Sequence, residues 1–213
     1  TKLKTQLAVC DVTLLPHTSC VIKAHCSSAG QILEKFSFRF WRSCPLDSYI
    51  HLHSVKMSNR STGSLTASLV KDFIVYRLRK AGYEQWSGAS QLNCDAPDSV
   101  HRAMRMMGDE FYTAYFESFE DMTGSINIHN ANLKEVYYGV LDATCETGIN
   151  WGRLCGLFVF SAMIAVKAMA CGREDVVGNI VQWATDYVES DRYSNWINQH
   201  GGWVSYCSLF LFF

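Results

Sequence analysis

The sequence predicts an all-α domain in which amphipathic helices surround one central hydrophobic helix. Apolar residues recur at steps of three and four along most of the chain after position 58, which is the spacing of a helix face. Only three prolines are present and none follows Pro97, so long helices are permitted over the rest of the chain. Residues 151–171 are apolar almost all round, as expected for a helix at the centre of a bundle.

The composition suits one globular domain and excludes several classes of function. The chain has 213 residues, of which 48% are apolar, enough for a sizeable core. Its 19 Lys and Arg residues nearly balance 20 Asp and Glu residues, so no basic patch for nucleic acid is expected. Nine irregularly spaced cysteines and no visible secretory signal indicate a reducing compartment without a disulfide framework.

Residues 1–56 differ from the rest, and we interpret them as a poorly ordered or atypical extension before a helical domain at 57–213. Helical periodicity is weak there, and phenylalanines at 36, 38 and 40 alternate as in a strand. The segment also contains four residues of zinc-ligand type, Cys20, His25, Cys26 and Cys44. Because their spacing fits no usual finger pattern, we expect no metal and no cofactor.

The first two helices are predicted from apolar stripes. The first stripe comprises Leu69, Val70, Phe73, Ile74, Leu78 and Ala81. Thr66 or Ser68 is expected to cap its start, and Gly82 to end it. A second helix is predicted from about Asp98 to Glu117, followed by a continuing apolar trend and a break at 124–132.

The remaining helices follow the same template. One is predicted from Leu133 to about Thr147, ended by Gly148. The hydrophobic helix 151–171 comes next, with Asn150 as its cap. An amphipathic helix over 176–188 and short helices at 194–200 and from Trp203 complete the chain. The length of 151–171 alone would permit a membrane span, but Lys167 and the flanking amphipathic helices favour a soluble core.

The segment 148–154 carries the most specific motif. Asn150 can satisfy free amides at the helix start, and Gly152 lets a partner helix approach the backbone closely. Arg153 offers a planar fork of donors that suits a carboxylate. The alternative for Arg153 is an ordinary surface charge, but Asn150, Trp151 and Gly152 beside it favour a binding role.

Three further segments are informative. In 196–203 two tryptophans bracket Gly201-Gly202, and we expect Trp203 in the core and Trp196 at the end of a binding site. The segment 100–111 combines an apolar face with an embedded Gly-Asp pair and comprises Val100, Met104, Met107, Gly108, Asp109 and Phe111. The third segment is the first predicted helix, extended to Trp86.

Together these four segments resemble the homology motifs of the B-cell lymphoma 2 (Bcl) family of cell-death regulators, over residues 68–210. The resemblance implies a bundle of about eight helices with a hydrophobic groove on its surface. A partner's amphipathic death-motif helix would lie in that groove, in the helix-in-groove mode for which this family is a known example. The segment 100–111 would be this chain's own death motif.

The resemblance also implies which residues bind the ligand helix. Arg153 should pair with the ligand's aspartate, and Gly152 should lie against its backbone. The predicted binding set is Asn150, Trp151, Gly152, Arg153, Phe111, Tyr115, Phe119, Met122, Val140, Leu141, Thr144, Phe160 and Trp196. Seven of these are apolar pocket candidates, namely Phe111, Tyr115, Phe119, Met122, Val140, Leu141 and Phe160. The alternative is that these seven are core, and we expect this of about half of them. Thr144 replaces what is more often a larger apolar residue in the family.

Whether the protein prevents or promotes cell death is less clearly indicated by the sequence than the fold is. The first helix and the Glu110-Phe111 pair resemble the protective members, so we expect an anti-apoptotic protein that sequesters the death-motif helices of Bax/Bak-like and single-motif partners. The alternative is an executioner of the Bax or Bak kind, whose helix 151–171 enters the outer mitochondrial membrane. An enzyme is not expected, because no Gly-rich phosphate loop, HExxH motif or nucleophile elbow is present.

The resemblance further implies a cytoplasmic protein associated with the outer mitochondrial membrane, capable of homo- or heterodimers. The apolar run 209–213 is too short to span a bilayer. Attachment is therefore peripheral or through a tail outside this sequence. A scaffolding bundle without a groove is the remaining alternative.

Overall fold

The computed structural model describes residues 62–86, 88, 92 and 98–208, and this part of the chain is entirely helical. Eight α-helices and one short 3-10 helix follow one another, with no strand among the described residues. The all-α prediction is therefore confirmed. The extension 1–56, with its expected strand pattern and zinc-type residues, lies outside the described residues, as does the run 209–213.

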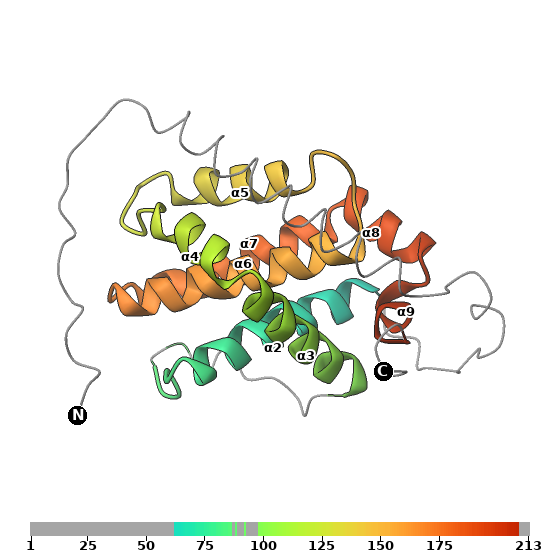
Figure 1. Ribbon diagram of the computed structural model, residues 1–213, viewed down its shortest axis with the longest axis horizontal. Helices are drawn as coiled ribbons and strands as arrows, with labels where there is room; N and C mark the ends of the chain where they lie inside the picture. Colours follow the sequence, from blue (N-terminus) through green and yellow to red (C-terminus); the bar gives the residue numbers. More distant parts are fainter. Residues whose placement is uncertain (1–61, 87, 89–91, 93–97, 209–213) are drawn as a thin grey trace.

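Helix α6, Trp151–Ala170, forms the centre of the bundle, as predicted. Helices α2, α3 and α7 pack along it, and α4 and α5 also pack on it (Figure 1). The side chain of Asn150 caps its start by accepting the backbone N–H of Arg153 at 2.8 Å. The chain leaves the helix through Gly172, whose φ of +71° favours glycine. Almost every side chain from 153 to 165 is buried.

Two polar side chains inside α6, Lys167 and Ser161, have partners on α4 and α5 or on the loop between them. The Lys167 ammonium donates to the carbonyls of Thr123, Gly124 and Ile126 at 2.6, 3.0 and 2.7 Å, where α4 ends. The Ser161 hydroxyl lies 2.6 Å from that of Tyr137. This helix is long and apolar enough to cross a membrane by length and composition, but 78% of its most apolar window is buried within the bundle.

Helix α2, Thr62–Lys80, begins earlier than predicted, so Thr66 and Ser68 do not cap it. Both residues instead make tertiary hydrogen bonds. The Thr66 hydroxyl accepts the indole N–H of Trp203 at 2.8 Å, and the Ser68 hydroxyl lies 2.9 Å from His101 Nε2. The predicted stop is confirmed, because Gly82 has a φ of +92° directly after the last turn.

The predicted helix from Asp98 to Glu117 is wrong at its C-terminal end. Asp98 caps the start, but the chain forms two helices, α3 at Ser99–Ala114 and α4 at Phe116–Gly124. The break is at Tyr115, whose φ and ψ of −125° and 22° are not helical. The change of direction lets α4 bury Phe119 and Met122 against the bundle.

The remaining helices match the predictions within a few residues at their ends. Helix α5 spans Leu133–Thr144 and ends three residues early, before turns that lead to Gly148. The 3-10 helix η2 at Glu174–Val176 leads into α7 at Val177–Glu189, and α8 covers Asp191–Gln199 rather than 194–200. Helix α9, Gly202–Ser208, follows the double-glycine turn, where φ is +83° and +69°.

The contact between α2 and α3 depends on a missing side chain. A Cβ atom at Gly108 would lie 2.3 Å from the Cε2 and Cζ atoms of Phe73, which is fully buried. Beside this contact, Arg105 forms a bidentate ion pair with the buried Asp72, at 2.9 and 2.5 Å. The two helices are therefore held together by close packing and by charge.

We expect Gly108→Ala to lower the free energy of unfolding by about 1–3 kcal/mol, because the Phe73 ring has little room to move. The matched control is Gly139→Ala in α5, where a Cβ meets nothing within 4 Å. That control should gain up to ~1 kcal/mol from helix propensity. Urea unfolding of both variants measures the difference. Equal stability of the two variants would show that the α2–α3 contact does not require glycine.

Candidate helix-binding site

The Arg153 guanidinium lies at the start of α6, against the loop that follows α5. Only 4% of the residue is exposed. Its Nη1 donates to the carbonyl of Gly148 at 2.8 Å, and its Nη2 donates to the Thr147 hydroxyl. Its Nε is buried and has no hydrogen-bond partner. Since a buried donor without an acceptor is costly, the site has one strong donor to offer an added acceptor.

Arg153 is buried, whereas the resemblance implied that it would meet a ligand in a groove on the surface. The reason is local, because the loop supplies two acceptors to a guanidinium that α6 would otherwise bury without partners. Neither acceptor is a carboxylate. An incoming carboxylate would therefore meet a cation whose charge is not neutralised by an ion pair among the described residues.

Trp151 and the two tryptophans of the segment 196–203 form an aromatic corner around the start of α6. The Trp151 ring lies 5.0 Å from that of Trp196, 5.7 Å from that of Trp203 and 5.1 Å from that of Tyr206. Trp203 is in the core, as predicted. Trp196 is only partly buried and stacks on His200 with a centroid distance of 4.0 Å. Trp196 thus lies at the surface beside the start of α6, along with the partly exposed Asn150 and Gly152.

The predicted pocket side chains are mostly closed off from solvent. We expected about half of the seven apolar pocket candidates to be core, but Tyr115 alone among these seven is partly exposed. The other six, Phe111, Phe119, Met122, Val140, Leu141 and Phe160, are buried, and so is Thr144. Aromatic contacts explain part of this closure, because the Phe111 ring lies 5.0 Å from that of Tyr115 and 5.7 Å from that of Phe119. The open groove therefore remains a prediction.

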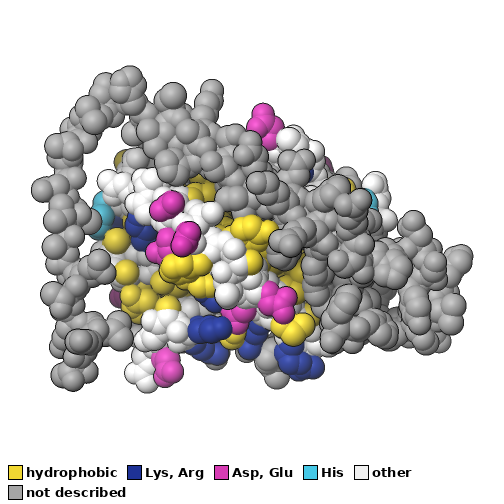
Figure 2. Space-filling view, viewed as in Figure 1, with side chains coloured by type: hydrophobic (Ala, Val, Ile, Leu, Met, Phe, Trp, Pro, Cys, Tyr) yellow, Lys and Arg dark blue, Asp and Glu magenta, His cyan; other side chains and the backbone are white. Residues whose placement is uncertain are grey.

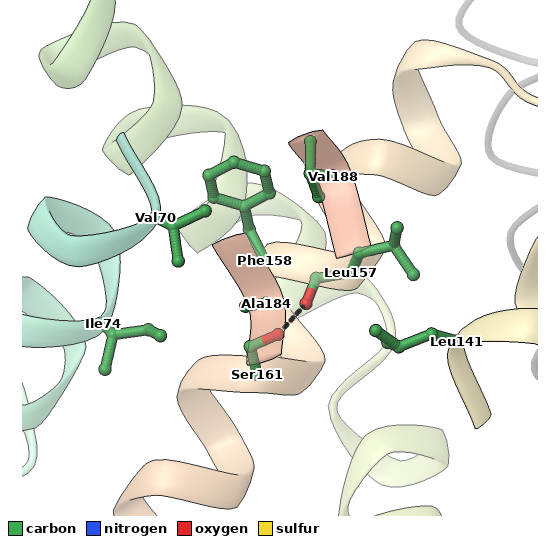
Figure 3. Close-up of a pocket in the computed structure, with 8 residues that line it drawn as sticks. All are labelled: Val70, Ile74, Leu141, Leu157, Phe158, Ser161, Ala184 and Val188. Atoms are coloured by element: carbon green, nitrogen blue, oxygen red, sulfur yellow. Dashed lines mark hydrogen bonds between the residues drawn. The ribbon is translucent and has the colours of Figure 1, made fainter. Parts of the chain in front are cut away.

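A small apolar pocket among the described residues lies elsewhere in the bundle (Figure 3). Its lining comes from α2, α5, α6 and α7, namely Val70, Ile74, Leu141, Leu157, Phe158, Ser161, Ala184 and Val188. Leu141 alone belongs to the predicted binding set. All eight side chains are buried, so this pocket is an interior packing gap and differs from the predicted groove.

The segment 100–111 uses its apolar face for the fold. Val100, Met104 and Met107 are buried together with Phe111, which confirms the stripe. Its Gly-Asp pair faces α2, because Gly108 contacts Phe73 and the Asp109 carboxylate accepts three side-chain hydrogen bonds. The chain's own death-motif residues are therefore occupied within the bundle.

The donors to Asp109 are Tyr76, Arg77 and Lys80, at 2.5, 2.6 and 2.7 Å. Burial acts to raise the pKa of Asp109, but hydrogen bonds from Lys80 and the other two donors outweigh it and hold that pKa below its ordinary value. The sequence reasoning missed these partners. Its interpretation of Arg77 and Lys80 as charges that complement the helix dipole gave no sign that both pair with one acid.

The C-terminal end of α5 is tied to α7 and α8. The Tyr187 hydroxyl donates to Asp142 at 2.8 Å and accepts from the Tyr193 hydroxyl at 2.7 Å. Arg192 donates to the carbonyl of Cys145 at 3.0 Å. These bonds fix the start of the loop that supplies the acceptors of Arg153.

The thiols of Cys145 and Cys155 are free and buried in the bundle. Burial raises the pKa of the Cys155 thiol to about 12, so this residue is a packing element rather than a nucleophile. Within the described ranges, no three His, Cys, Asp or Glu side chains are placed to hold a metal ion.

Comparison with known proteins identifies relatives of this arrangement. Residues 104–203 match the family model described as apoptosis regulator proteins, Bcl-2 family. The chain is 31% identical to the apoptosis regulator Bcl-2 of Gallus gallus over 54% of this chain and 49% of that protein, and 32% identical to the Bcl-2-like protein 1 of the same species over 52% and 48%. The chain spans about half the length of these curated relatives.

A solved structure extends the similarity to the fold. Trichoplax adhaerens trBcl-2L2 bound to trBak BH3 matches with a TM-score of 0.63 and 25% identity, over 70% of this chain and 99% of that chain. The matched share of this chain is larger than that of the two Gallus gallus relatives, since the helical arrangement is compared directly.

The lowered pKa of Asp109 predicts a pH-dependent contribution to stability. A carboxylate whose pKa is lowered in the folded state stabilises the fold when the pH is above the ordinary pKa of 3.8. This contribution is lost as the pH falls through the folded-state pKa. The free energy of unfolding of wild type should exceed that of Asp109→Asn by about 1–2 kcal/mol near neutral pH. This difference should shrink below about pH 4. Urea unfolding across this range tests it, with Asp121→Asn on the exposed side of α4 as control. Parallel curves for wild type and Asp109→Asn would contradict the assignment.

Proposed function

We propose, for a chain that belongs to the Bcl-2 family of apoptosis regulators, that it restrains cell death by sequestering the amphipathic BH3 helix of pro-apoptotic partners. The BH3 helix is the death-motif helix expected from the sequence. The observation that carries the proposal is the Arg153 guanidinium, which is buried at the start of α6 with its Nε lacking an acceptor. The structurally similar Trichoplax protein, whose partner is a Bak BH3 segment, supports the choice of ligand.

The chemistry at Arg153 suits the aspartate of such a helix. A carboxylate can accept from Nε and from one terminal nitrogen of the same guanidinium, which forms a planar two-bond pair. The interaction would replace one loop hydrogen bond and satisfy the orphan donor. Gly152, which precedes Arg153 and is partly exposed, would allow the ligand backbone close to α6.

Insertion of a ligand helix requires the covered pocket side chains to be uncovered. Helices α4 and α5 pack on α6 more than on each other, so they can move apart from one another while the Lys167 contact of α4 and the Tyr137–Ser161 hydrogen bond of α5 hold each helix to α6. Phe119 and Met122 on α4 and Val140 on α5 would then form the apolar floor. Burial of the ligand's apolar stripe supplies the favourable free energy, at about 25 cal/mol per Å².

Replacing Arg153 should weaken binding of the Trichoplax Bak BH3 peptide by about 2–5 kcal/mol, or roughly 30-fold or more. Arg153→Gln removes the charge and keeps much of the side-chain volume. Calorimetric titration measures the affinity, and circular dichroism checks that the helices remain. Arg79→Gln, which removes an exposed arginine in the last turn of α2, is the matched control and should retain binding. Unchanged affinity of folded Arg153→Gln would overturn the role assigned to this residue.

A second candidate function is membrane permeabilisation by an executioner of the Bax or Bak kind. The observation in its favour is the length and apolarity of α6. Against it, release of α6 would strip Lys167 of three carbonyl acceptors and break the buried hydrogen bond between Ser161 and Tyr137. The sequence of the first helix, α2, also resembles the protective members. This helix is bonded to α3 through Asp109. We therefore place the protective role first, at the cytoplasmic surface of the outer mitochondrial membrane.

Liposome release separates the two directions. The full chain, mixed with the Trichoplax Bak BH3 peptide and liposomes of mitochondrial lipid composition, should release no entrapped dye. It should also reduce the release caused by an added Bak-type protein, because it captures the BH3 helix. Dye release by this chain alone with the peptide would favour the executioner.

A further inference from the structure

The Arg153 guanidinium has one edge that is only partly used. Acidic and basic side chains both lie on the face of the molecule drawn in Figure 2, so no surface of one sign there selects a charged ligand. A specific cationic edge is a better guide. In Arg105, Nε and Nη2 donate side by side to the two carboxylate oxygens of Asp72. At Arg153, Nη2 donates only to the uncharged Thr147 hydroxyl, and the buried Nε has no partner.

Thr147 is placed to bring an anion to this edge. The residue is exposed and lies in the irregular loop that leads from the end of α5 to the start of α6 (Figure 1). Because its Oγ1 already contacts Nη2 of Arg153, any group attached to Oγ1 lies beside the Nε–Nη2 edge. A phosphate offers three acceptor oxygens, carries a charge of about −1.5 to −2 near pH 7 and pairs with arginine through two hydrogen bonds. One oxygen can accept from Nη2 while another accepts from Nε.

A second arginine lies beside the same loop. Arg192 on α8 donates to the carbonyl of Cys145 at 3.0 Å. Burial raises the pKa of the Cys145 thiol, but Arg153 and Arg192 both act to lower it, so both cations lie near the start of the loop. Neither arginine forms an ion pair within the described part of the chain. The adjacent Glu146 is exposed, so solvent weakens its repulsion of a phosphate on Thr147.

We propose that Thr147 is a phosphorylation site, and that its phosphate binds the Nε–Nη2 edge of Arg153 and thereby blocks the BH3 site. The inference rests on the proposed function, because this edge is the one assigned to the ligand's aspartate. A protein kinase supplies the reaction. Oγ1 of Thr147 forms a bond to the γ-phosphorus of a nucleoside triphosphate, the bond to the departing diphosphate breaks, and the hydroxyl proton passes to a base of the kinase. The phosphate then competes from within the chain, at a high effective concentration.

The modification itself is tested by mass spectrometry. The full chain is incubated with an animal-cell extract and MgATP and then cleaved with trypsin, which releases the peptide 135–153. This peptide should carry one phosphate on Thr147. The same peptide of Thr147→Ala should carry none. A wild-type peptide without phosphate on Thr147 would overturn the site.

The effect on binding is tested with phosphothreonine installed at position 147 of the full chain. Calorimetric titration with the Trichoplax Bak BH3 peptide should give an affinity at least about tenfold weaker than that of the unmodified chain. The control has phosphothreonine at Thr113, which is exposed on the side of α3 opposite the buried Phe111, and should retain binding. Equal affinities of the two phosphorylated chains would overturn the inference. Failure of the unmodified chain to bind would instead overturn the proposed function.

A measurement without any ligand tests the contact with Arg153. Phosphorus NMR follows the titration of the phosphate on Thr147. Because a guanidinium favours the dianion, the pKa of this phosphate should be lower in the folded chain than in the chain unfolded in urea. Arg153→Gln should remove most of the difference, with circular dichroism as the check that the helices remain. The same pKa in folded and unfolded wild type would show that the phosphate does not bind Arg153.

Discussion

The burial of α6 on nearly all sides is the constraint on which the rest of the fold depends. A helix of 20 residues with no polar face can remain in water only when amphipathic helices cover it, which explains why α2, α3 and α7 pack along its length. The same burial makes every polar group on α6 dependent on a partner. Asn150 caps the start, Ser161 meets Tyr137 and Lys167 meets the end of α4. Arg153 is the exception, since one of its donors is left over.

The leftover donor of Arg153 and the Gly-Asp pair of α3 are two places in the bundle where a carboxylate and a cationic side chain can meet. Gly108 and Asp109 are engaged by α2 through close packing and three hydrogen bonds. The arrangement inside the chain therefore resembles, in its use of glycine and aspartate, what we propose a foreign helix does at Gly152 and Arg153. Glycine permits close approach in both places, and a carboxylate is recognised by cationic side chains.

Much of the fold could be predicted because local signals and tertiary packing agree. The stripe of the first helix, the Asn150 cap and the glycine stops are all local features, and all are present. The break at Tyr115 was missed because Phe111, Tyr115 and Phe119 keep a four-residue spacing through it, so the sequence contains no signal of a change in direction. The site was harder to predict. Whether Phe111 or Val140 faces solvent, and whether Arg153 is buried, depends on contacts between distant segments that periodicity does not encode.

The bonds from Tyr187 and Arg192 bear on how α5 moves. They fasten the C-terminal end of α5 and the following Cys145 to α7 and α8, while Asn132 at the other end supplies no side-chain cap. A helix held at its C-terminal end, and at Tyr137 by the buried hydrogen bond to Ser161, can move most in its first turn. Displacement should therefore be greatest near Leu133 and smallest beside Arg153. A ligand helix would therefore find the Arg153 end of the binding site already formed. It would have to displace α5 only at the apolar end of the site.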